Sequence, residues 1–455
     1  MPVNSFENYP MSWIPEKPDK SIPLYRSFAS QLEEAILSGR LAPNTLLPPQ
    51  RELADYLDVN LSTITKAYKI CAQKGYIYAS VGKGTYVSPN ASLYQSIPKN
   101  EQKIQYNLAQ IEPYHATDPY VEQALHTICS RPDFRSHLTY QTTESTKYYQ
   151  SSAVTYLKSL QIPAVSEQIL LASGSQNALT ITLLACFKSG DRIAVDPYTY
   201  HHFKMLANFL RINLIPIEND FAGMLPDHLD SLCHTGNMKG IYLMPTCSNP
   251  TSVEMPLARR LALADVIRKY RLTVIEDDSF RFLASADAPS FLELLPSQTV
   301  YICSTSKSLC AGTRLAYLLC PNVLKTSIQY AHTAVNMHLS SLDAQLISEL
   351  INNGAYKDMQ TKIKVLSQKN NDIYDHIFQE ENPYCNPYSF FRWQKITSEP
   401  AVFFREMEQT GIHLMDSDCF NSGIADTQHY MRIVLSALPN TDLERTLEMI
   451  VHKNR

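Results

Sequence analysis

The chain has 455 residues, enough for two or three domains, and its 44% hydrophobic content allows a large buried core. Its 40 basic and 44 acidic side chains give a net charge of -4, which excludes a uniformly basic nucleic-acid coat but not a local basic patch. Because the ten cysteines lack metal-site spacing and no segment resembles a signal peptide or a membrane span, we expect a cytoplasmic protein with reduced thiols, no metal and no membrane contact.

Three segments of different composition follow one another along the chain. Residues 20–87 are rich in helix signals, and residues 88–104 have the proline and polar content of a linker. Residues 105–455 alternate short apolar runs with longer helical patterns, which predicts an α/β fold with a mainly parallel sheet covered by helices. The predicted strands include residues 169–171, 192–195, 241–244, 272–275 and 299–302.

The first segment has the spacing of a helix-turn-helix. Apolar residues recur every four positions over residues 24–38, which predicts an amphipathic helix that ends near Gly39. A short helix over residues 51–57 follows, then a tight turn, then a second helix over residues 61–74. Two short helices so close together are typical of a helix-turn-helix, whose second helix fits the major groove of DNA.

A two-stranded wing and a basic patch are predicted beside these helices. Residues 76–78 and 85–87 flank a glycine-containing turn at residues 82–84, which favours a β-hairpin. Between Asn60 and Val87 the chain carries no acid and four lysines, namely Lys66, Lys69, Lys74 and Lys83. The local charge of about +4 suits phosphate contact, although a small helical domain with a solvated basic face remains the alternative.

Several short motifs add a family resemblance. They are Pro23-Leu24-Tyr25, Gly39-Arg40-Leu41, Leu47-Pro48, Arg51-Glu52-Leu53-Ala54, Thr63-Ile64, Ala67-Tyr68, Gly75-Tyr76 and Gly82-Lys83-Gly84-Thr85. With them the segment resembles the winged helix of the GntR family. The resemblance and the basic patch imply that the residues against DNA are Arg51, Ser62, Thr63, Lys66 and Lys83. Relatives often carry arginine where this chain has Leu61, and a leucine cannot make arginine's bidentate contact with guanine.

Polar residues follow several of the strands predicted in the third segment. Residues 173–178 open an apolar helix, where backbone N–H groups and a small hydroxyl suit a phosphate. Tyr200 lies just beyond the end of the next strand, where an aromatic ring could cover a flat cofactor, and Asn249 lies in an Asn-Pro turn after another. Taken alone, residues 173–178 would be interpreted as an ordinary strand-to-helix turn. A surface or core tyrosine is the alternative for Tyr200, and a plain Asn-Pro turn the alternative for Asn249.

Lys307 lies in the most informative group of residues. Ser304 and Ser306 precede it after a strand, and Arg314 lies seven residues beyond. Lysine forms Schiff bases with carbonyl compounds, and neighbouring cations lower its pKa toward the reactive neutral amine. A lone lysine is usually a surface residue, but two hydroxyls and an arginine beside this one favour a cofactor site.

Two charged positions complete the pattern. Asp277 lies among three acids at the end of a strand, where it could keep a pyridine nitrogen protonated; a solvated acidic loop is the alternative. Arg432 lies in the apolar strand over residues 431–435 and needs a partner, either a substrate carboxylate or an internal salt bridge. Pyridoxal 5′-phosphate (PLP) chemistry requires all of these groups: a lysine, donors to the phosphate, an acid at the ring nitrogen, an aromatic ring and a cation that binds a carboxylate.

The third segment resembles the fold-type I, class I/II aminotransferases over nearly all of residues 105–455, most specifically in Ser304-x-Ser306-Lys307-x-Leu309, Gly312 and Arg314-Leu315-x-Tyr317. The resemblance implies PLP as cofactor, a smaller C-terminal lobe, and Lys307 as the catalytic residue that carries the aldimine. It further implies that phosphate is held by Gly174, Ser175, Gln176, Ser304, Ser306 and Arg314, the ring nitrogen by Asp277, the phenolic oxygen by Asn249, the ring face by Tyr200 and the substrate carboxylate by Arg432.

A GntR-type winged helix linked to an aminotransferase-like domain resembles the MocR family of transcription regulators. This implies a head-to-tail homodimer that binds a double-stranded DNA operator and senses PLP or an amino compound at Lys307. Ser279 and Ser252 replace a tyrosine and a glycine of relatives, so we expect transamination to be weak or lost. A working aminotransferase with an accessory DNA-binding domain, and a repressor whose large domain only dimerises it, are the alternatives.

Overall fold

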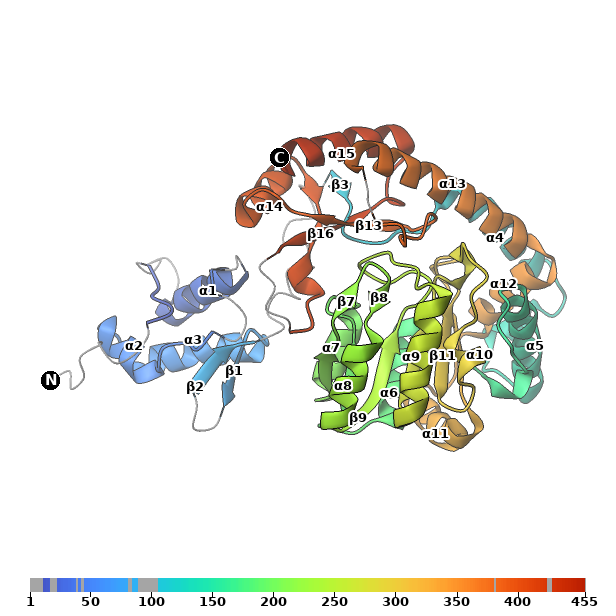
Figure 1. The fold of residues 1–455 in the computed structure, drawn as a ribbon, viewed down its shortest axis with the longest axis horizontal. Helices are drawn as coiled ribbons and strands as arrows, with labels where there is room; N and C mark the ends of the chain where they lie inside the picture. Colours follow the sequence, from blue (N-terminus) through green and yellow to red (C-terminus); the bar gives the residue numbers. More distant parts are fainter. Residues whose placement is uncertain are drawn as a thin grey trace. The chain divides into compact units, whose positions relative to one another are not determined.

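A computed structural model describes residues 11–16, 23–37, 40–41, 45–80, 84–88, 105–379, 382–423 and 428–454. The chain divides into two compact units, an N-terminal one and a larger one that contains nearly all described residues from Gln105 onward (Figure 1). Apart from Ser88, the predicted linker lies outside the described residues. Within the described part, none of the helices is long and apolar enough to cross a membrane.

The N-terminal unit contains α1 (Leu24–Leu37), α2 (Gln50–Tyr56) and α3 (Leu61–Gln73). Their apolar faces meet in one core that includes Phe28, Leu32, Leu53 and Ile64. Asn60 starts α3, because its side-chain oxygen accepts a hydrogen bond from the Ser62 backbone N–H at 2.8 Å. The three predicted helices are confirmed within a residue or two, and the predicted stop at Gly39 lies outside the described residues.

The predicted wing is confirmed as a hairpin. Strands β1 (Ile77–Ser80) and β2 (Gly84–Val87) pair antiparallel, with Ile77 opposite Val87. The turn between them, including Lys83, lies outside the described residues. The N-terminal unit is therefore a winged helix-turn-helix.

A seven-stranded sheet forms the centre of the larger unit. Its order is β4 (Ile169–Ala172), β12 (Ala316–Leu319), β11 (Thr299–Ser304), β10 (Thr273–Asp277), β9 (Met238–Leu243), β5 (Arg192–Val195) and β6 (Asn213–Pro216). Only β12 runs antiparallel to its neighbours; every other pair in this sheet is parallel. The predicted mainly parallel sheet is confirmed.

Helices cover both faces of this sheet (Figure 1). Successive strand residues point to opposite faces, so Ile275 packs in one core with Leu179 and Phe203, while Val274 packs in another with Leu263. The helices of this large lobe are α4 (Asp118–Cys129), α5 (Thr143–Ser159), α6 (Gly174–Cys186), α7 (His201–Phe209), α8 (Pro226–Thr235), α9 (Leu257–Tyr270), α10 (Phe291–Leu294), α11 (Lys325–Val335) and α12 (Ser341–Asn352). A short hairpin, β7 (Asn219–Asp220) and β8 (Gly223–Met224), follows β6.

The smaller C-terminal lobe implied by the family resemblance is present. Its sheet has the order β13 (Phe391–Lys395), β16 (Tyr430–Val434) and β15 (Met415–Asp416), all antiparallel. A second pair joins β14 (Ile412–His413) to β3 (Tyr106–Asn107), so the start of the larger unit belongs to this lobe. Its helices are α13 (Ala355–Phe378) and α15 (Asn440–Asn454), and α14 (Pro400–Gln409) precedes β14 in the chain.

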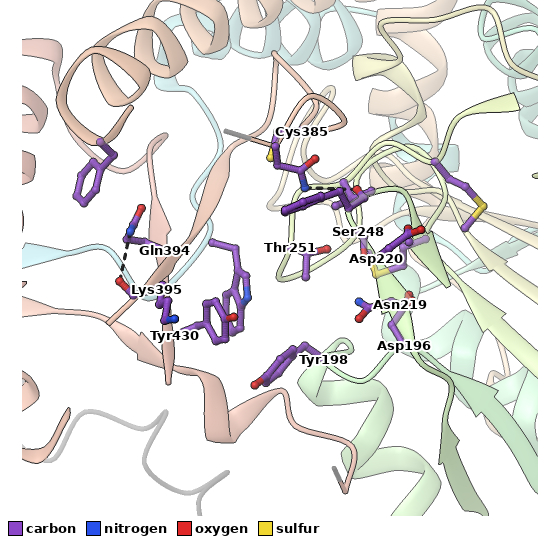
Figure 2. Close-up of a pocket in the computed structure, with 18 of the residues that line it drawn as sticks. Asp196, Tyr198, Asn219, Asp220, Ser248, Thr251, Cys385, Gln394, Lys395 and Tyr430 are labelled. Carbon is purple, nitrogen blue, oxygen red and sulfur yellow. Dashed lines mark hydrogen bonds between the residues drawn. The ribbon is translucent and has the colours of Figure 1, made fainter. Parts of the chain in front are cut away.

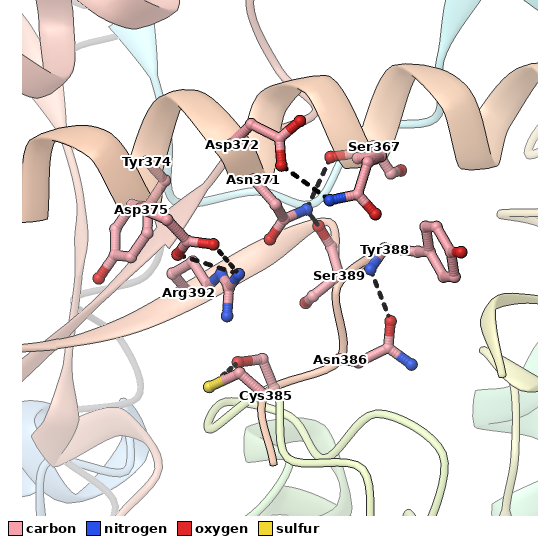
Figure 3. Close-up of polar contacts among 12 residues, drawn as sticks. Ser367, Asn371, Asp372, Tyr374, Asp375, Cys385, Asn386, Tyr388, Ser389 and Arg392 are labelled. Atoms are coloured by element: carbon pink, nitrogen blue, oxygen red, sulfur yellow. Dashed lines mark hydrogen bonds and ion pairs between the residues drawn. The ribbon is translucent and has the colours of Figure 1, made fainter. Parts of the chain in front are cut away.

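Polar contacts hold α13 against the chain that leads into β13 (Figure 3). The Asn371 amide donates to the backbone carbonyls of Ser367 and Ser389, at 2.7 and 2.8 Å. Arg392 is almost fully buried and pairs with Asp375 at 3.2 Å. These contacts fix the position of β13, whose later residues face the large lobe.

Candidate functional site

Lys307 follows β11 at the edge of the sheet where the parallel strands end. Its Nζ donates a hydrogen bond to the Ile111 carbonyl at 2.5 Å. Burial lowers the pKa of Lys307 to about 8; the Glu112 carboxylate opposes this shift, while Arg314 and Arg432 add to it. Near neutral pH, Lys307 is therefore a neutral, nucleophilic amine in part of the molecules.

An anion cradle lies at the start of α6. Gly174 has a φ of +84°, and a Cβ atom there would lie 2.8 Å from Nη2 of Arg314. Arg314 in turn donates to the Ser306 hydroxyl at 3.4 Å, and the backbone N–H of Ser306 donates to Oγ of Ser304 at 3.2 Å. A helix N-terminus, two hydroxyls and a guanidinium thus converge as a phosphate requires.

The other two predicted phosphate residues lie in the first turn of the same helix. Gln176 donates from Nε2 to the His202 carbonyl at 3.3 Å, while its buried Oε1 has no hydrogen-bond partner within the described part of the chain. Ser175 is half-buried beside it. The structure therefore brings all six predicted phosphate residues to one end of the sheet.

Asp277 ends β10 with its carboxylate buried and oriented by two hydroxyls. Ser279 donates to Oδ1 at 2.6 Å and Tyr242 donates to Oδ2 at 3.1 Å. Burial raises the pKa of Asp277, and the hydrogen bonds from Ser279 and Tyr242 partly offset this effect. Tyr242 also stacks on Phe203 with ring centroids 3.8 Å apart. No sequence signal distinguished Tyr242 from the other residues of an apolar strand.

The acids on either side of Asp277 are also buried, so the alternative of a solvated acidic loop is wrong. Glu276 accepts hydrogen bonds from the backbone N–H groups of Phe291 and Leu292, both at 2.9 Å, at the start of α10. Asp278 lies 3.4 Å from the Tyr301 hydroxyl. Glu276 and Asp278 thus have structural partners, and Asp277 is the acid beside the Lys307 site.

Arg432 on β16 carries a buried guanidinium that is only 2% exposed. It donates from Nη1 to Oδ1 of Asn249 at 2.8 Å and from Nη2 to the Ala109 carbonyl. Among the described residues no carboxylate forms an ion pair with it, and its Nε has no hydrogen-bond partner. The internal salt bridge left open by the sequence is therefore not found there, and burial lowers the pKa of Arg432 to about 10.

Tyr200 lies between the two ends of the site. Burial raises the pKa of Tyr200 to about 12; Asp277 adds to the shift, while Arg432 and Arg314 oppose it, so all three charges act at this ring. His202, which the sequence did not single out, has its ring centroid 5.4 Å from that of Tyr200. Burial lowers the pKa of His202, and Arg432 and Arg314 lower it further. Both shifts favour the uncharged forms, so Tyr200 and His202 provide neutral aromatic rings in the site.

In the N-terminal unit, the predicted DNA-contacting residues of the described part lie on one short stretch. Arg51, Ser62 and Lys66 are exposed and Thr63 is half-buried, whereas Lys83 lies outside the described residues. Lys74 forms a 2.6 Å ion pair with Glu33 of α1. Counting charges from Asn60 onward missed this acid, so the basic patch is weaker than its four lysines suggest.

Comparison with known families agrees with this arrangement. Residues 24–87 match the family described as "Bacterial regulatory proteins, gntR family", and residues 103–450 match "Aminotransferase class I and II". The chain belongs to the MocR-type family of transcription regulators, in which a GntR winged helix precedes a class I and II aminotransferase domain.

Relatives extend over almost the whole chain. The HTH-type transcriptional regulator YdeF of Bacillus subtilis is 34% identical, over 99% of this chain and 98% of that protein. The vitamin B6 salvage pathway transcriptional repressor PtsJ of Salmonella typhimurium is 23% identical, over 93% of this chain and 96% of that protein. The match to both relatives therefore extends over nearly their whole length.

Solved structures support the fold of the larger unit. LysN, an α-aminoadipate aminotransferase from Thermus thermophilus solved with N-(5′-phosphopyridoxyl)-L-leucine, matches with a TM-score of 0.69 and 19% identity, over 84% of this chain and 96% of its own. The kynurenine aminotransferase of Pyrococcus horikoshii matches with a TM-score of 0.68 and 19% identity, over 78% of this chain and 91% of its own. These likenesses define the fold-type I transferase architecture.

Proposed function

We propose that this protein is a PLP-dependent transcription regulator, which binds a DNA operator through its winged helix and senses PLP or an amino compound at Lys307. One observation carries the proposal. The buried amine of Lys307 shares a site with the Gly174 anion cradle and with Arg432, a buried guanidinium that has no described counter-ion.

The residues present fit PLP as cofactor. Gly174 leaves room at the start of α6 that a Cβ atom would fill, so this end would hold the phosphate group. Asp277 would face the ring nitrogen, Tyr200 the ring, and the amide of Asn249 the phenolic oxygen, because Oδ1 of Asn249 is already engaged by Arg432. When bound, PLP supplies an aldehyde that condenses with primary amines and a ring that withdraws electrons.

Each of the residues around that cofactor would have a separate role. Lys307 provides the amine, and its lowered pKa keeps part of it unprotonated. The Ile111 carbonyl orients this amine through a hydrogen bond. Arg432 would bind the carboxylate of an amino compound, which would supply the missing negative charge in a bidentate contact.

Of the two substitutions, Ser279 supports a sensor with weak or no transamination, whereas Ser252 leaves the local backbone unchanged. Ser279 stands where relatives carry a tyrosine, and its hydroxyl is committed to Asp277. Ser252 keeps the left-handed backbone, with a φ of +59°, that a glycine would adopt freely. The turn around Asn249 therefore keeps its shape, while the support of the cofactor's phenolic side is changed.

The proposal includes a head-to-tail homodimer in the cytoplasm, where a DNA operator is accessible. Large exposed apolar side chains on the larger unit support an interface between copies. Tyr140 is 71% exposed, Met337 75% and Tyr330 80%. The ring of Tyr140 also contacts that of His338, with centroids 4.9 Å apart and an interplanar angle of 32°.

The test is the visible absorption spectrum of the purified protein titrated with PLP. We expect a saturable band for the parent and for the control Lys188→Ala, whose lysine is exposed and outside the site, and none for Lys307→Ala. A titration with an equal band in Lys307→Ala would contradict the proposal. A PLP-dependent change in operator affinity, measured by fluorescence anisotropy, would link the site to DNA binding.

A working aminotransferase is the second candidate, because Arg432 would bind the carboxylate of a substrate as well as that of an effector. Turnover separates the two functions. An amino donor and a keto acid give steady product formation in an enzyme, but only a spectral change in a sensor. Sustained turnover that is lost in Lys307→Ala would favour the enzyme.

A further inference from the structure

A cavity of about 680 Å³ is lined by both lobes of the larger unit (Figure 2). The large lobe contributes residues at or beyond the ends of β5, β6 and β9, among them Asp196, Tyr198 and Ser248. The C-terminal lobe contributes Trp393 from β13 and Tyr430 from β16. None of the predicted PLP residues lines this cavity, although its size is typical of small-molecule sites.

Three aromatic rings form one wall. The rings of Trp393 and Tyr430 are nearly parallel, with an interplanar angle of 9° and centroids 5.4 Å apart. Tyr198 packs against both, at centroid distances of 5.1 and 5.8 Å. Figure 2 shows Tyr198 and Tyr430 on the same side of the cavity. Aromatic faces carry partial negative charge and attract cations, most strongly where water is excluded.

A half-buried carboxylate, that of Asp196, lines the same space. Among the described residues, neither a hydrogen bond nor an ion pair to the Asp196 side chain occurs, and its backbone carbonyl accepts a hydrogen bond from the Ser422 hydroxyl at 2.9 Å. Burial raises the pKa of Asp196 to about 7. By contrast, Asp220 in the same lining already pairs with Arg259 at 2.7 Å. A carboxylate with little access to water and no counter-ion is unfavourable, and a bound cation would stabilise it.

We propose that this cavity binds a small organic cation, such as a protonated or quaternary amine, between the ring cluster of Tyr198, Trp393 and Tyr430 and the carboxylate of Asp196. The hydroxyls of Ser248 and Thr251 offer further polar contacts in the lining. Because the ligand would contact both lobes, it would favour one lobe arrangement over others. This non-covalent site is independent of the amine of Lys307.

The test uses tetramethylammonium as probe, since it has no N–H group and cannot condense with PLP. The chain has two tryptophans, so Trp13→Phe leaves Trp393 as the only indole fluorophore. We expect a saturable change in Trp393 fluorescence with tetramethylammonium chloride and none with potassium chloride at equal ionic strength. Adding Lys307→Ala to this background should leave the dissociation constant unchanged.

Two further variants locate the site. In the Trp13→Phe background, Asp196→Asn should weaken binding by about tenfold or more, because it keeps the shape and removes the charge. Asp227→Asn, the same change at an exposed acid of α8 outside the lining, should have no effect. Tyr430→Leu removes one aromatic face and should also weaken binding of the probe, so it provides an independent test if Asp196→Asn does not fold. A missing saturable response, unchanged binding in the folded variants, or loss of binding in Lys307→Ala would each overturn the proposal.

Discussion

The winged-helix surface and the Lys307 site both present cationic side chains to an anionic partner, but the cations of the first are exposed to water, whereas the second includes a buried one. Arg51 and Lys66 are exposed on the N-terminal unit, whereas Arg432 is almost completely buried without a described carboxylate partner. Exposed charges attract weakly and are screened by salt, while a buried charge interacts strongly and is costly to leave unpaired. The first arrangement suits a long polymer of phosphates, and the second suits one small ligand.

The largest expected effect comes from the buried arginine. Arg432→Ala should weaken binding of amino acids to the PLP-loaded protein by about 100-fold, since hydrogen bonds between charged groups contribute about 1.5–3 kcal/mol each. Attachment of PLP itself should persist. Spectral titration with a panel of L-amino acids measures both, and Arg432→Lys should restore only part of the affinity because it lacks the planar fork. Equal amino-acid affinity in parent and variant would contradict this role.

The Lys307 amine should make PLP attachment depend on pH. Its pKa of about 8 means that the neutral, reactive fraction falls about tenfold per pH unit below that value. The initial rate of band formation should therefore rise with pH and level off above about pH 8. Stopped-flow measurements across pH 6–9 would reveal the profile, and a rate that is flat over this range would show that the amine is not the titrating group.

The exposed surface should respond much less. Lys66→Ala should weaken DNA binding a few-fold for every sequence, and should reduce the salt dependence of log affinity by about one unit. Lys74→Ala is the matched control, because its ammonium is already paired with Glu33 and has less to offer a phosphate. Fluorescence anisotropy at several salt concentrations would measure both slopes. A larger loss for Lys74→Ala than for Lys66→Ala would refute this ranking.

The smallest change is expected at Ser279. Ser279→Ala removes one hydrogen bond to Asp277, which is worth about 1 kcal/mol, so PLP affinity should fall by about fivefold. The pKa of Asp277 should rise, because that hydrogen bond lowers it. Absorbance titration with PLP measures the first effect. A loss of binding as complete as that of Lys307→Ala would mean that Ser279 has a larger task than orienting Asp277.

Local patterns predicted the fold well where one chemical signal dominated. The period-four apolar residues of α1 and the apolar runs of β5 and β11 defined elements within a residue or two. The order of polar residues after those strands also predicted which side chains meet, because parallel strands end at one edge of a sheet. Gly174, Lys307 and Arg314 accordingly lie near one another.

Other parts of the site depend on contacts between distant segments, which have no local signal. Tyr242 donates to Asp277 across neighbouring strands, and the partners of Arg432 include a carbonyl 323 residues earlier in the chain. The pairing of Lys74 with Glu33 joins two helices in the same way. The cavity at Asp196 is likewise invisible in sequence, because its two walls come from lobes that meet only after folding.

The one antiparallel strand of the seven-stranded sheet, β12, has a consequence for how the site assembles. It returns beside β11 after residues 305–315, so Lys307 and Arg314 lie on one short connection whose closure costs little entropy. β4, which precedes Gly174, pairs with the other edge of β12. The residues predicted to hold the phosphate therefore come from the ends of three adjacent strands, β4, β12 and β11, whereas Arg432 belongs to the C-terminal lobe. Partial unfolding of that lobe should release amino compounds before it releases the cofactor.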